Sequence, residues 1–228
     1  MYMIRLDNVS KIYKPNIKAL DHINLSIKPG EFVSLVGQSG TGKTTLVRCL
    51  IGEEQPTEGS IQIGDWDITT IGKREIPYLR RQIAVIFQDF KLLPKKTLAE
   101  NVAFALEVAG KSNKKIKELV PKVMGIVGLG QKMKRYPNEV SGGEQQRAAI
   151  ARALVYQPKV LLADEPTGNL DSINAQEIID LLLKINEFGT TVLLVTHNKD
   201  IVNRLKRRVV TLHDGKIISD QAVGKYII

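Results

Sequence analysis

The chain has 228 residues, 43% of them hydrophobic and 25% charged, so it can bury a sizeable core and is neither a disordered nor a fibrous chain. Its formal net charge of +9 suits a nucleic acid, an anionic membrane surface or a polyphosphate ligand, and charge alone does not choose among them. Residues 102–106 form one of the longest uninterrupted apolar runs, far short of the roughly 20 residues that a membrane-spanning helix needs.

The first part of the chain is expected to form short strands. It opens without a basic stretch followed by an apolar core, so we expect no secretory signal and a protein that stays in the cytoplasm. Apolar residues alternate with polar ones at 4–6, 23–27 and 61–63, and turn signals such as Pro29-Gly30 separate these stretches. Residues 1 to about 30, with about 59 to 68, therefore predict a small antiparallel sheet.

Four short apolar runs are typical of strands that are covered on both faces. They span residues 32–36, 83–87, 160–163 and 192–195. A helical pattern at 43–51 follows the first run and stops at Gly52, and another at 173–188 precedes the last run and stops at Gly189. This alternation predicts a largely parallel α/β sheet. The single cysteine, Cys49, excludes an internal disulfide and is expected to be a packed core thiol.

Residues 89–157 have mainly helical patterns and predict an all-helical insertion in the α/β core. Apolar residues between Ile116 and Val127 recur at helical spacing, and Pro121 among them is expected to kink or break that helix. Near the end of the chain, Asp214-Gly215 predicts a tight hairpin. We expect a single domain over 1–228, in which 1–88 and 158–228 form the core with the antiparallel part and 89–157 form the helical subdomain.

A phosphate-binding loop is predicted between the first core strand and its helix. The sequence GQSGTGKT matches G-x-x-x-x-G-K-[ST] in the context that this motif requires, although a glycine-rich turn is the structural alternative. Backbone amides of such a loop surround phosphates, Lys43 would reach the β- and γ-phosphates, and the Thr44 hydroxyl would ligate Mg²⁺. The residues expected to contact the nucleotide here are Gly37, Gln38, Ser39, Gly40, Thr41, Gly42, Lys43, Thr44 and Thr45.

Two carboxylates end the buried run at 160–163. Asp164 would hold the metal ion, directly or through water, and Glu165 would act as the general base for attack on the γ-phosphate. An apolar strand followed by acidic residues is common in proteins, so this interpretation depends on the phosphate-binding loop upstream.

A second anion site is predicted where SGGEQ precedes a helical pattern. The hydroxyl of Ser141, the glycines Gly142 and Gly143, and a helix N-terminus are suited to bind an anion. One chain rarely needs two sites for one γ-phosphate. Taken together, the loop, the SGGEQ motif, the strand ending in Asp164 and a later His197 resemble the ATP-binding cassette family, and the resemblance covers essentially the whole chain.

This resemblance implies a fold and several residue roles. The fold would be a P-loop nucleotide-binding domain with a RecA-like parallel-sheet core, a small antiparallel β subdomain and a helical subdomain. Tyr13 would stack on adenine, Gln88 would sense Mg²⁺ and the attacking water, and His197 would contact the γ-phosphate. The signature residues Ser141, Gly142, Gly143 and Glu144 and the D-loop residue Asp171 would complete the site. Val140 stands where the family usually has leucine.

The family resemblance also implies how the protein assembles. The signature of one copy would close on the nucleotide of another, so ATP would drive homodimer formation. Residues 87–108 narrow the resemblance to a bacterial cell-division ATPase that works with an integral membrane protein, on the cytoplasmic face of the membrane as a peripheral subunit. A short helix of that partner would occupy a cleft between core and helical insertion, where Phe90, Leu92 and Leu93 are candidate anchors, unless they pack internally.

The sequence offers two alternative functions, one within the same family branch and one that involves DNA. The motifs SGGEQQR and ADEPTGNLD are shared with relatives of the lipoprotein-release and macrolide-export type. A DNA-associated cassette ATPase would suit the positive charge, but such proteins carry a long coiled coil between the two half-sites. Here Gln88 and Ser141 are separated by a short segment without a sustained heptad pattern, so we expect no nucleic acid partner.

Overall fold

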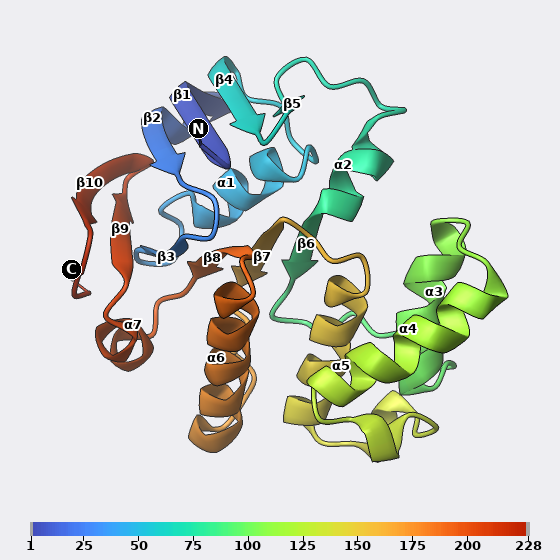
Figure 1. Cartoon of the computed structure of the whole chain (residues 1–228). Helices are drawn as coiled ribbons and strands as arrows, with labels where there is room; N and C mark the ends of the chain where they lie inside the picture. Colours follow the sequence, from blue (N-terminus) through green and yellow to red (C-terminus); the bar gives the residue numbers. More distant parts are fainter. Residues whose placement is uncertain (1, 227–228) are drawn as a thin grey trace.

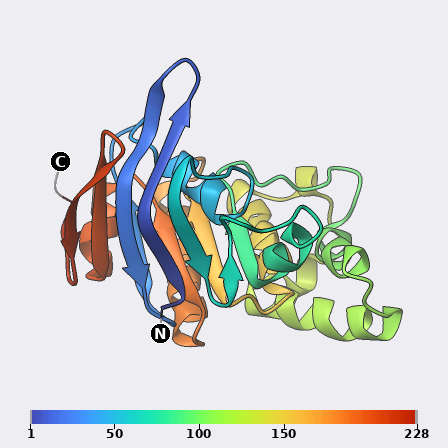
Figure 2. The ribbon, with the colours of Figure 1, turned by 90° about the horizontal axis from the view of Figure 1, so that it is seen from above.

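A computed structural model describes residues 2–226 as two β-sheets with helices between and below them and a cluster of helices, from residues 98–154, at one side (Figures 1 and 2). The strands are β1 (Ile4–Tyr13), β2 (Ile17–Ile27), β3 (Phe32–Val36), β4 (Glu58–Ile63), β5 (Trp66–Asp67), β6 (Ile83–Ile86), β7 (Val160–Asp164), β8 (Thr191–Val195), β9 (Arg208–His213) and β10 (Lys216–Gln221). The helices are α1 (Lys43–Leu50), α2 (Ile76–Gln82), α3 (Leu98–Val108), α4 (Asn113–Ile126), α5 (Gly142–Leu154), α6 (Ser172–Glu187) and α7 (Lys199–Leu205), with 3₁₀ turns η1 (Gly130–Lys132) and η2 (Pro137–Glu139).

The larger sheet has the strand order β10-β9-β3-β8-β7-β6. All neighbouring pairs from β9 to β6 are parallel, and β10 alone adds an antiparallel edge. The four predicted core strands are confirmed with small shifts of their ends: β6 stops at Ile86, β7 includes Asp164, and β8 starts at Thr191. Because β3, β6, β7 and β8 are parallel, their carboxyl ends meet at one edge of the sheet.

The smaller sheet is antiparallel and has the order β2-β1-β4-β5, as the alternating pattern predicts. Its apolar face and the larger sheet enclose α1, so residues of β1, α1 and β3 share one core. Figure 1 shows α1 between the two sheets. Cys49 on α1 is fully buried, and burial raises the pKa of its thiol to about 11. The cysteine is a packed core residue, as expected.

The first two strands are longer than the alternating pattern indicated. They form a hairpin that projects beyond the other strands in Figure 2, and their register shifts between Leu6 and Ile12. Asn8 and His22 have positive φ angles at these irregularities. The backbone amide of Asn8 donates to the Asn24 side chain at 2.9 Å, and that of His22 donates to the Ser10 hydroxyl at 3.1 Å. Side chains thus satisfy amides that a regular ladder would pair.

The predicted helical region contains α3, α4, η1, η2 and α5, which share a second core with α6 and one face of the larger sheet. Pro121 does not break α4, and the expectation of a break is therefore wrong. Val120, Val123 and Met124 are buried on one side of this helix, whereas Pro121 is exposed, so water can reach the backbone group that the proline leaves unpaired. Tertiary packing keeps the helix continuous.

The ends of the predicted helices and the last hairpin agree with the sequence signals. Gly52 and Gly189 follow α1 and α6 with positive φ angles, which glycine adopts without strain. Asp214 and Gly215 connect β9 and β10 and have φ angles of 46° and 73°, as a type I′ hairpin turn requires. Helix α2, which precedes β6, was not expected from the sequence.

Candidate active site

A cavity of about 350 Å³ lies where the parallel strands end. It is lined by Ala19, Ser39, Gly40, Gly42, Lys43, Thr44, Thr45, Gln88, Asp164, Glu165 and His197. The loop at 37–42 follows β3, Gln88 lies two residues after β6, and the two carboxylates are the last residue of β7 and the next one. Residues far apart in the sequence therefore converge on one cavity because their strands are parallel neighbours.

The glycines of the loop are required by its close contacts. A Cβ atom on Gly42 would lie 2.2 Å from the Ala19 carbonyl oxygen, and the φ angle of Gly42 is 102°. A Cβ atom on Gly37 would lie 2.3 Å from the Leu212 carbonyl oxygen. Gly40 has no such neighbour within 4 Å and lines the cavity. The loop is thus fixed on the protein side and open toward the cavity.

Lys43 supplies a buried positive charge at the start of α1. Its Nζ donates to the carbonyl oxygens of Gly37 at 2.8 Å and Gln38 at 2.7 Å. Burial lowers the pKa of Lys43, and the nearby charges of Glu165 and Asp164 oppose that shift. Among the ion pairs within residues 2–226, none includes this ammonium group, so an anion in the cavity would add an ionic partner to its two carbonyl contacts.

Asp164 and Glu165 differ in environment although they are adjacent. Burial raises the pKa of Asp164, and the charge of Glu165 raises it further. Glu165 has a φ angle of 48°, and its amide donates to the Val195 carbonyl oxygen at 2.9 Å. Oε1 of Glu165 lies 2.7 Å from Nδ1 of the largely exposed His197. A left-handed residue at this position is strained, and it directs the carboxylate toward the cavity.

Gln88 is connected to a residue 81 positions later. Its Nε2 donates to Oδ1 of Asn169 at 3.1 Å, and Nδ2 of Asn169 donates to the Gln88 carbonyl oxygen at 3.3 Å. A Cβ atom on Gly168 would lie 2.9 Å from Nε2 of Gln88, so the close approach needs glycine. The sequence identified the D-loop motif that contains Asn169, but it gave no signal for this contact, which depends on the tertiary fold. Ala19 lines the cavity and was not predicted from the sequence.

The predicted signature residues lie outside this cavity. Ser141 caps α5, its hydroxyl accepting from the Glu144 amide while the Glu144 carboxylate accepts from the Ser141 amide, and Glu144 also pairs with Lys132. A Cβ atom on Gly143 would collide with Oδ1 of Asn174 at 2.0 Å. Ser141, Gly142, Gly143 and Glu144 are all absent from the residues that line the cavity. The structure therefore separates the two predicted anion sites within one chain.

Other predicted contacts are also outside the cavity lining. Asp171 caps α6, and its Oδ1 accepts from the amides of Ile173 at 3.0 Å and Asn174 at 2.9 Å. These bonds lower the pKa of Asp171. Tyr13 ends β1 with Lys11 Nζ 5.1 Å from its ring centre. Gly37, Gln38 and Thr41 belong to the loop and support it, Thr41 through a 2.9 Å hydrogen bond to the Gln38 carbonyl oxygen, but they do not line the cavity.

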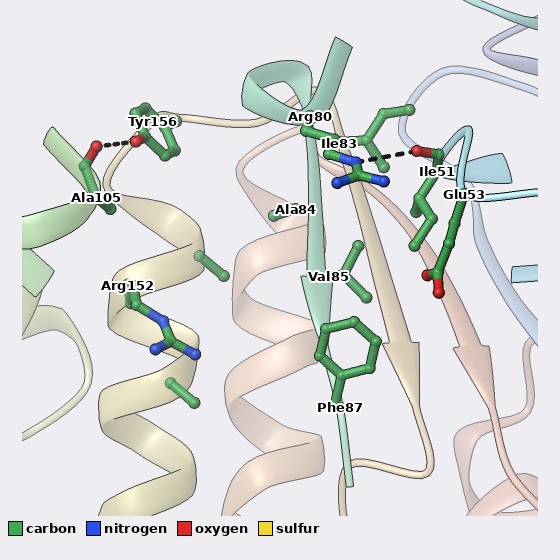
Figure 3. A pocket seen from close by; sticks show the side chains of 12 residues that line it. Ile51, Glu53, Arg80, Ile83, Ala84, Val85, Phe87, Ala105, Arg152 and Tyr156 are labelled. Carbon is green, nitrogen blue, oxygen red and sulfur yellow. Dashed lines mark hydrogen bonds between the residues drawn. The ribbon is translucent and has the colours of Figure 1, made fainter. Parts of the chain in front are cut away.

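The candidate partner anchors need a correction. A second cavity of about 640 Å³, which we name the interlobe groove, lies between β6 and α2 on one side and α3 and α5 on the other (Figure 3). Its lining is Ile51, Glu53, Arg80, Ile83, Ala84, Val85, Phe87, Ala105, Ala149, Arg152, Ala153 and Tyr156. Phe90, Leu92 and Leu93 are not among them. Leu92 packs on the helical core, and the half-buried Phe90 lies against Gly142, so these two side chains have contacts within the chain.

The chain is similar to one family and to named proteins over nearly its whole length. The model of the family described as ABC transporter matches residues 20–168. The "Cell division ATP-binding protein FtsE" of Bacillus subtilis is 50% identical over 224 residues, covering 98% of both chains. The proteins of the same name from Mycobacterium tuberculosis and Escherichia coli K12 are 51% and 46% identical, covering 98% and 94% of this chain and 98% and 97% of theirs.

Solved structures of cassette proteins have the same fold. A dimeric post-hydrolysis structure of the ATP-binding cassette MJ0796 with ADP and Pi superposes with a TM-score of 0.87 at 36% identity, covering 98% of this chain and all of the other. The cbiO1 protein of Clostridium perfringens superposes with a TM-score of 0.90 at 30% identity, covering 97% and 88%. These likenesses match the predicted fold class. Within residues 2–226, none of the helices is long and apolar enough to span a membrane.

Proposed function

Because the chain belongs to the ATP-binding cassette family and is an ATPase of that family, we propose that it is the ATP-hydrolysing subunit of a bacterial membrane-associated complex of the FtsE–FtsX kind. The observation that carries this proposal is the convergence of Lys43, Asp164, Glu165 and His197 on one cavity beside a glycine-rich loop. A buried cation without an ionic partner faces a general-base candidate across a space that is open to a triphosphate.

The cavity residues fit ATP and Mg²⁺. The open face of Gly40 and the ammonium of Lys43 suit the phosphates, and the Thr44 hydroxyl, the Asp164 carboxylate and the Gln88 side chain are oxygen donors of the kind that Mg²⁺ prefers. When bound, the metal ion would neutralise charge on the phosphate oxygens. Thr44 lies in the first turn of α1, Gln88 follows β6 and Asp164 ends β7, so the fold itself holds these oxygen atoms in place.

The chain's own residues then account for hydrolysis. Lys43 holds the β- and γ-phosphates, and Gln88 orients a water molecule opposite the bond to the β-phosphate. The Glu165 carboxylate takes a proton from this water while the water oxygen forms a bond to the γ-phosphorus. The bond between the γ-phosphorus and the bridging oxygen breaks, which yields ADP and phosphate. His197 hydrogen-bonds Glu165 and holds its carboxylate in position.

Two copies are needed because the signature residues are outside the cavity of their own chain. Ser141 and Gly143 would close over the γ-phosphate held by a second copy, so two chains enclose two nucleotides. The likeness to a dimeric cassette structure supports this arrangement. Tyr13 would stack on adenine at the outer side, and Asp171 would lie at the interface between the copies. ATP binding favours the dimer because the phosphates contact both chains only in that state.

A membrane partner would couple to the ATPase through the interlobe groove. The relatives named FtsE support an FtsX-like integral membrane protein as this partner and a peripheral position at the cytoplasmic face. The groove is lined mainly by apolar side chains and lies between the lobe with the phosphate loop and the lobe with the signature. A short helix can place apolar anchors in such a groove. Movement of this helix would then change the distance between the phosphate-binding loop and the signature residues.

Replacing Ala105 by tryptophan is expected to fill the interlobe groove and abolish capture of the FtsX-like partner. Ala105 lines the groove from α3, remote from the nucleotide cavity. Co-purification of the tagged chain from detergent-solubilised native membranes gives the readout, with ATP titration as the control for an intact nucleotide site. Unchanged partner capture by the folded variant would refute the groove as the docking site. If the wild-type chain captured a lipoprotein-release or macrolide-export permease instead, the chain would be the ATPase subunit of that kind of transporter, whose members share the SGGEQQR motif.

A further inference from the structure

Arg152 is a charged side chain on the helical wall of the interlobe groove. Its Nη1 donates to the Lys91 carbonyl oxygen at 2.7 Å and its Nη2 donates to the Phe90 carbonyl oxygen at 3.2 Å. No ion pair between Arg152 and a carboxylate occurs within residues 2–226. Burial lowers the pKa of the guanidinium, and no acidic group opposes this effect. The structure thus keeps a positive charge in the groove without a counter-charge.

Arg208 is another partly buried arginine of this chain, and its charge is balanced by carboxylates. Its side chain is 17% exposed and pairs with Glu31 at 2.9 Å and Asp220 at 2.7 Å. These carboxylates raise the pKa of Arg208 despite its burial. Arg208 has no role in either cavity, and its charges are balanced within the chain. Arg152, by contrast, faces a cavity that a partner can enter.

The remaining charges in the groove do not offset Arg152. Arg80 and Glu53 lie on the opposite wall, near Ile51, and Arg80 donates to the Ile51 carbonyl oxygen at 3.2 Å (Figure 3). Glu53 and Arg80 carry opposite charges, and neither forms an ion pair with Arg152 within residues 2–226. Most of the other lining side chains are aliphatic or aromatic. The groove is therefore mainly apolar, and the positive charge of Arg152 on α5 has a second cation beside it, because the Lys91 ammonium lies 3.8 Å from the centre of the Phe87 ring.

The Arg152 guanidinium has N–H donors that are not used in the contacts with the two carbonyl oxygens. Arginine carries five N–H donors, and Arg152 uses one on each of two carbonyl oxygens. In Figure 3 its guanidinium extends from α5 on the side that faces β6 and Phe87. A carboxylate that enters the groove can bond to the free donors while the two carbonyl contacts are kept. In an apolar groove, such a charge-assisted pair is stronger than it would be in water.

We propose that the partner segment that fills the interlobe groove carries a carboxylate side chain, aspartate or glutamate, which pairs with Arg152. The inference rests on the proposed function, because it assumes that a membrane partner docks in this groove. Charge complementarity selects this occupant: an apolar helix without an acidic residue would bury the guanidinium uncompensated, and a basic residue at that point would be repelled.

The test measures binding of the FtsX-like partner, purified in detergent, to the wild-type chain and to Arg152→Gln. Glutamine can still donate to a carbonyl oxygen but has no charge, and the Kd is expected to rise about tenfold or more. Arg204→Gln removes the same charge from α7, outside the groove, and is expected to change the Kd by less than about threefold. Thermal unfolding and ATP titration of each variant report on its folding.

A second measurement does not depend on the folding of Arg152→Gln. Each acidic residue in the cytoplasmic segments of the partner is replaced by its amide, and the wild-type chain is titrated with each product. One replacement is expected to weaken binding as much as Arg152→Gln does, and the two changes together should cost no more than either alone. If no single replacement weakens binding, or if Arg152→Gln binds with unchanged affinity, the carboxylate proposal is wrong. The proposal that the partner docks in the groove is tested separately, and intact partner binding by Ala105→Trp would refute it.

Discussion

Replacing Glu165 by glutamine is expected to reduce ATP turnover by about a hundredfold or more while ATP still binds. The amide has the same shape as the carboxylate but cannot accept the proton of the attacking water, and general-base catalysis typically contributes 10²- to 10⁴-fold, roughly. Lys43 and the phosphate loop remain intact, so the nucleotide is held but not cleaved. The variant should therefore accumulate ATP-bound dimers, which size-exclusion chromatography with ATP detects.

The matched control for this experiment is Glu187→Gln. Glu187 is the exposed last residue of α6, so its replacement removes an equal charge without touching the cavity. Its turnover should equal that of the unmodified chain within error. Unimpaired phosphate release by Glu165→Gln would rule out this carboxylate as the base, and loss of ATP binding in the same variant would indicate a structural rather than a chemical role.

Replacing Lys43 by alanine is expected to weaken ATP binding about a hundredfold. The ammonium is the buried cation of the cavity, and a hydrogen bond to a charged group contributes about 1.5 to 3 kcal/mol. Alanine also leaves the Gly37 and Gln38 carbonyl oxygens without their donor, which loosens the loop. Calorimetric titration with ATP measures the affinity directly.

Lys184→Ala is the control for the loss of a lysine. Lys184 is exposed near the end of α6 and does not line the cavity, so its replacement should leave the Kd for ATP unchanged. A melting curve separates a misfolded Lys43 variant from a folded one with a weak site. An unchanged ATP affinity in folded Lys43→Ala would contradict the phosphate-loop interpretation. Together, the glutamate and lysine variants distinguish loss of chemistry from loss of binding.

Local patterns predicted the parts of the fold that depend on neighbouring residues. The short apolar strands and the glycine-rich loop carry their signals within a few positions, because burial on both faces and tight turns restrict each residue separately. The alternation in β1 and β2 was interrupted at Asn8 and His22, where positive φ angles shift the register, so the sequence indicated shorter strands than the structure has. Pro121 does not break α4, because packing of the apolar side of the helix outweighs the local signal.

The arrangement of the site was predictable only in part. The topology of a parallel sheet explains why the loop, Asp164 and His197 meet, since each follows a strand end at the same edge. The bond between Gln88 and Asn169 and the contacts of Arg152 with the segment after Gln88 join residues more than 60 positions apart. No local pattern encodes such contacts. For the same reason the sequence left open whether Phe90, Leu92 and Leu93 line the groove or pack internally; the structure has Phe87 and Arg152 in the lining instead.

The account depends most on a catalytic site that two copies share. Within one chain, Ser141 at the start of α5 is not among the residues that line the cavity beside Lys43. A variant with a defective phosphate loop and a variant with a defective signature should therefore each be inactive alone. Mixing the two variants should restore activity. Symmetric pairing makes this prediction quantitative, because a mixed dimer keeps one site with both halves intact.

The most direct measurement mixes Lys43→Ala with Ser141→Arg and follows ATP hydrolysis. Each variant alone should be nearly inactive, the first for lack of phosphate binding and the second because a bulky charged side chain blocks closure on the partner's nucleotide. An equimolar mixture should recover about a quarter of the wild-type rate, since about half of the dimers are mixed and each has one complete site of two. A mixture as inactive as its components, although mixed dimers form, would contradict the shared site.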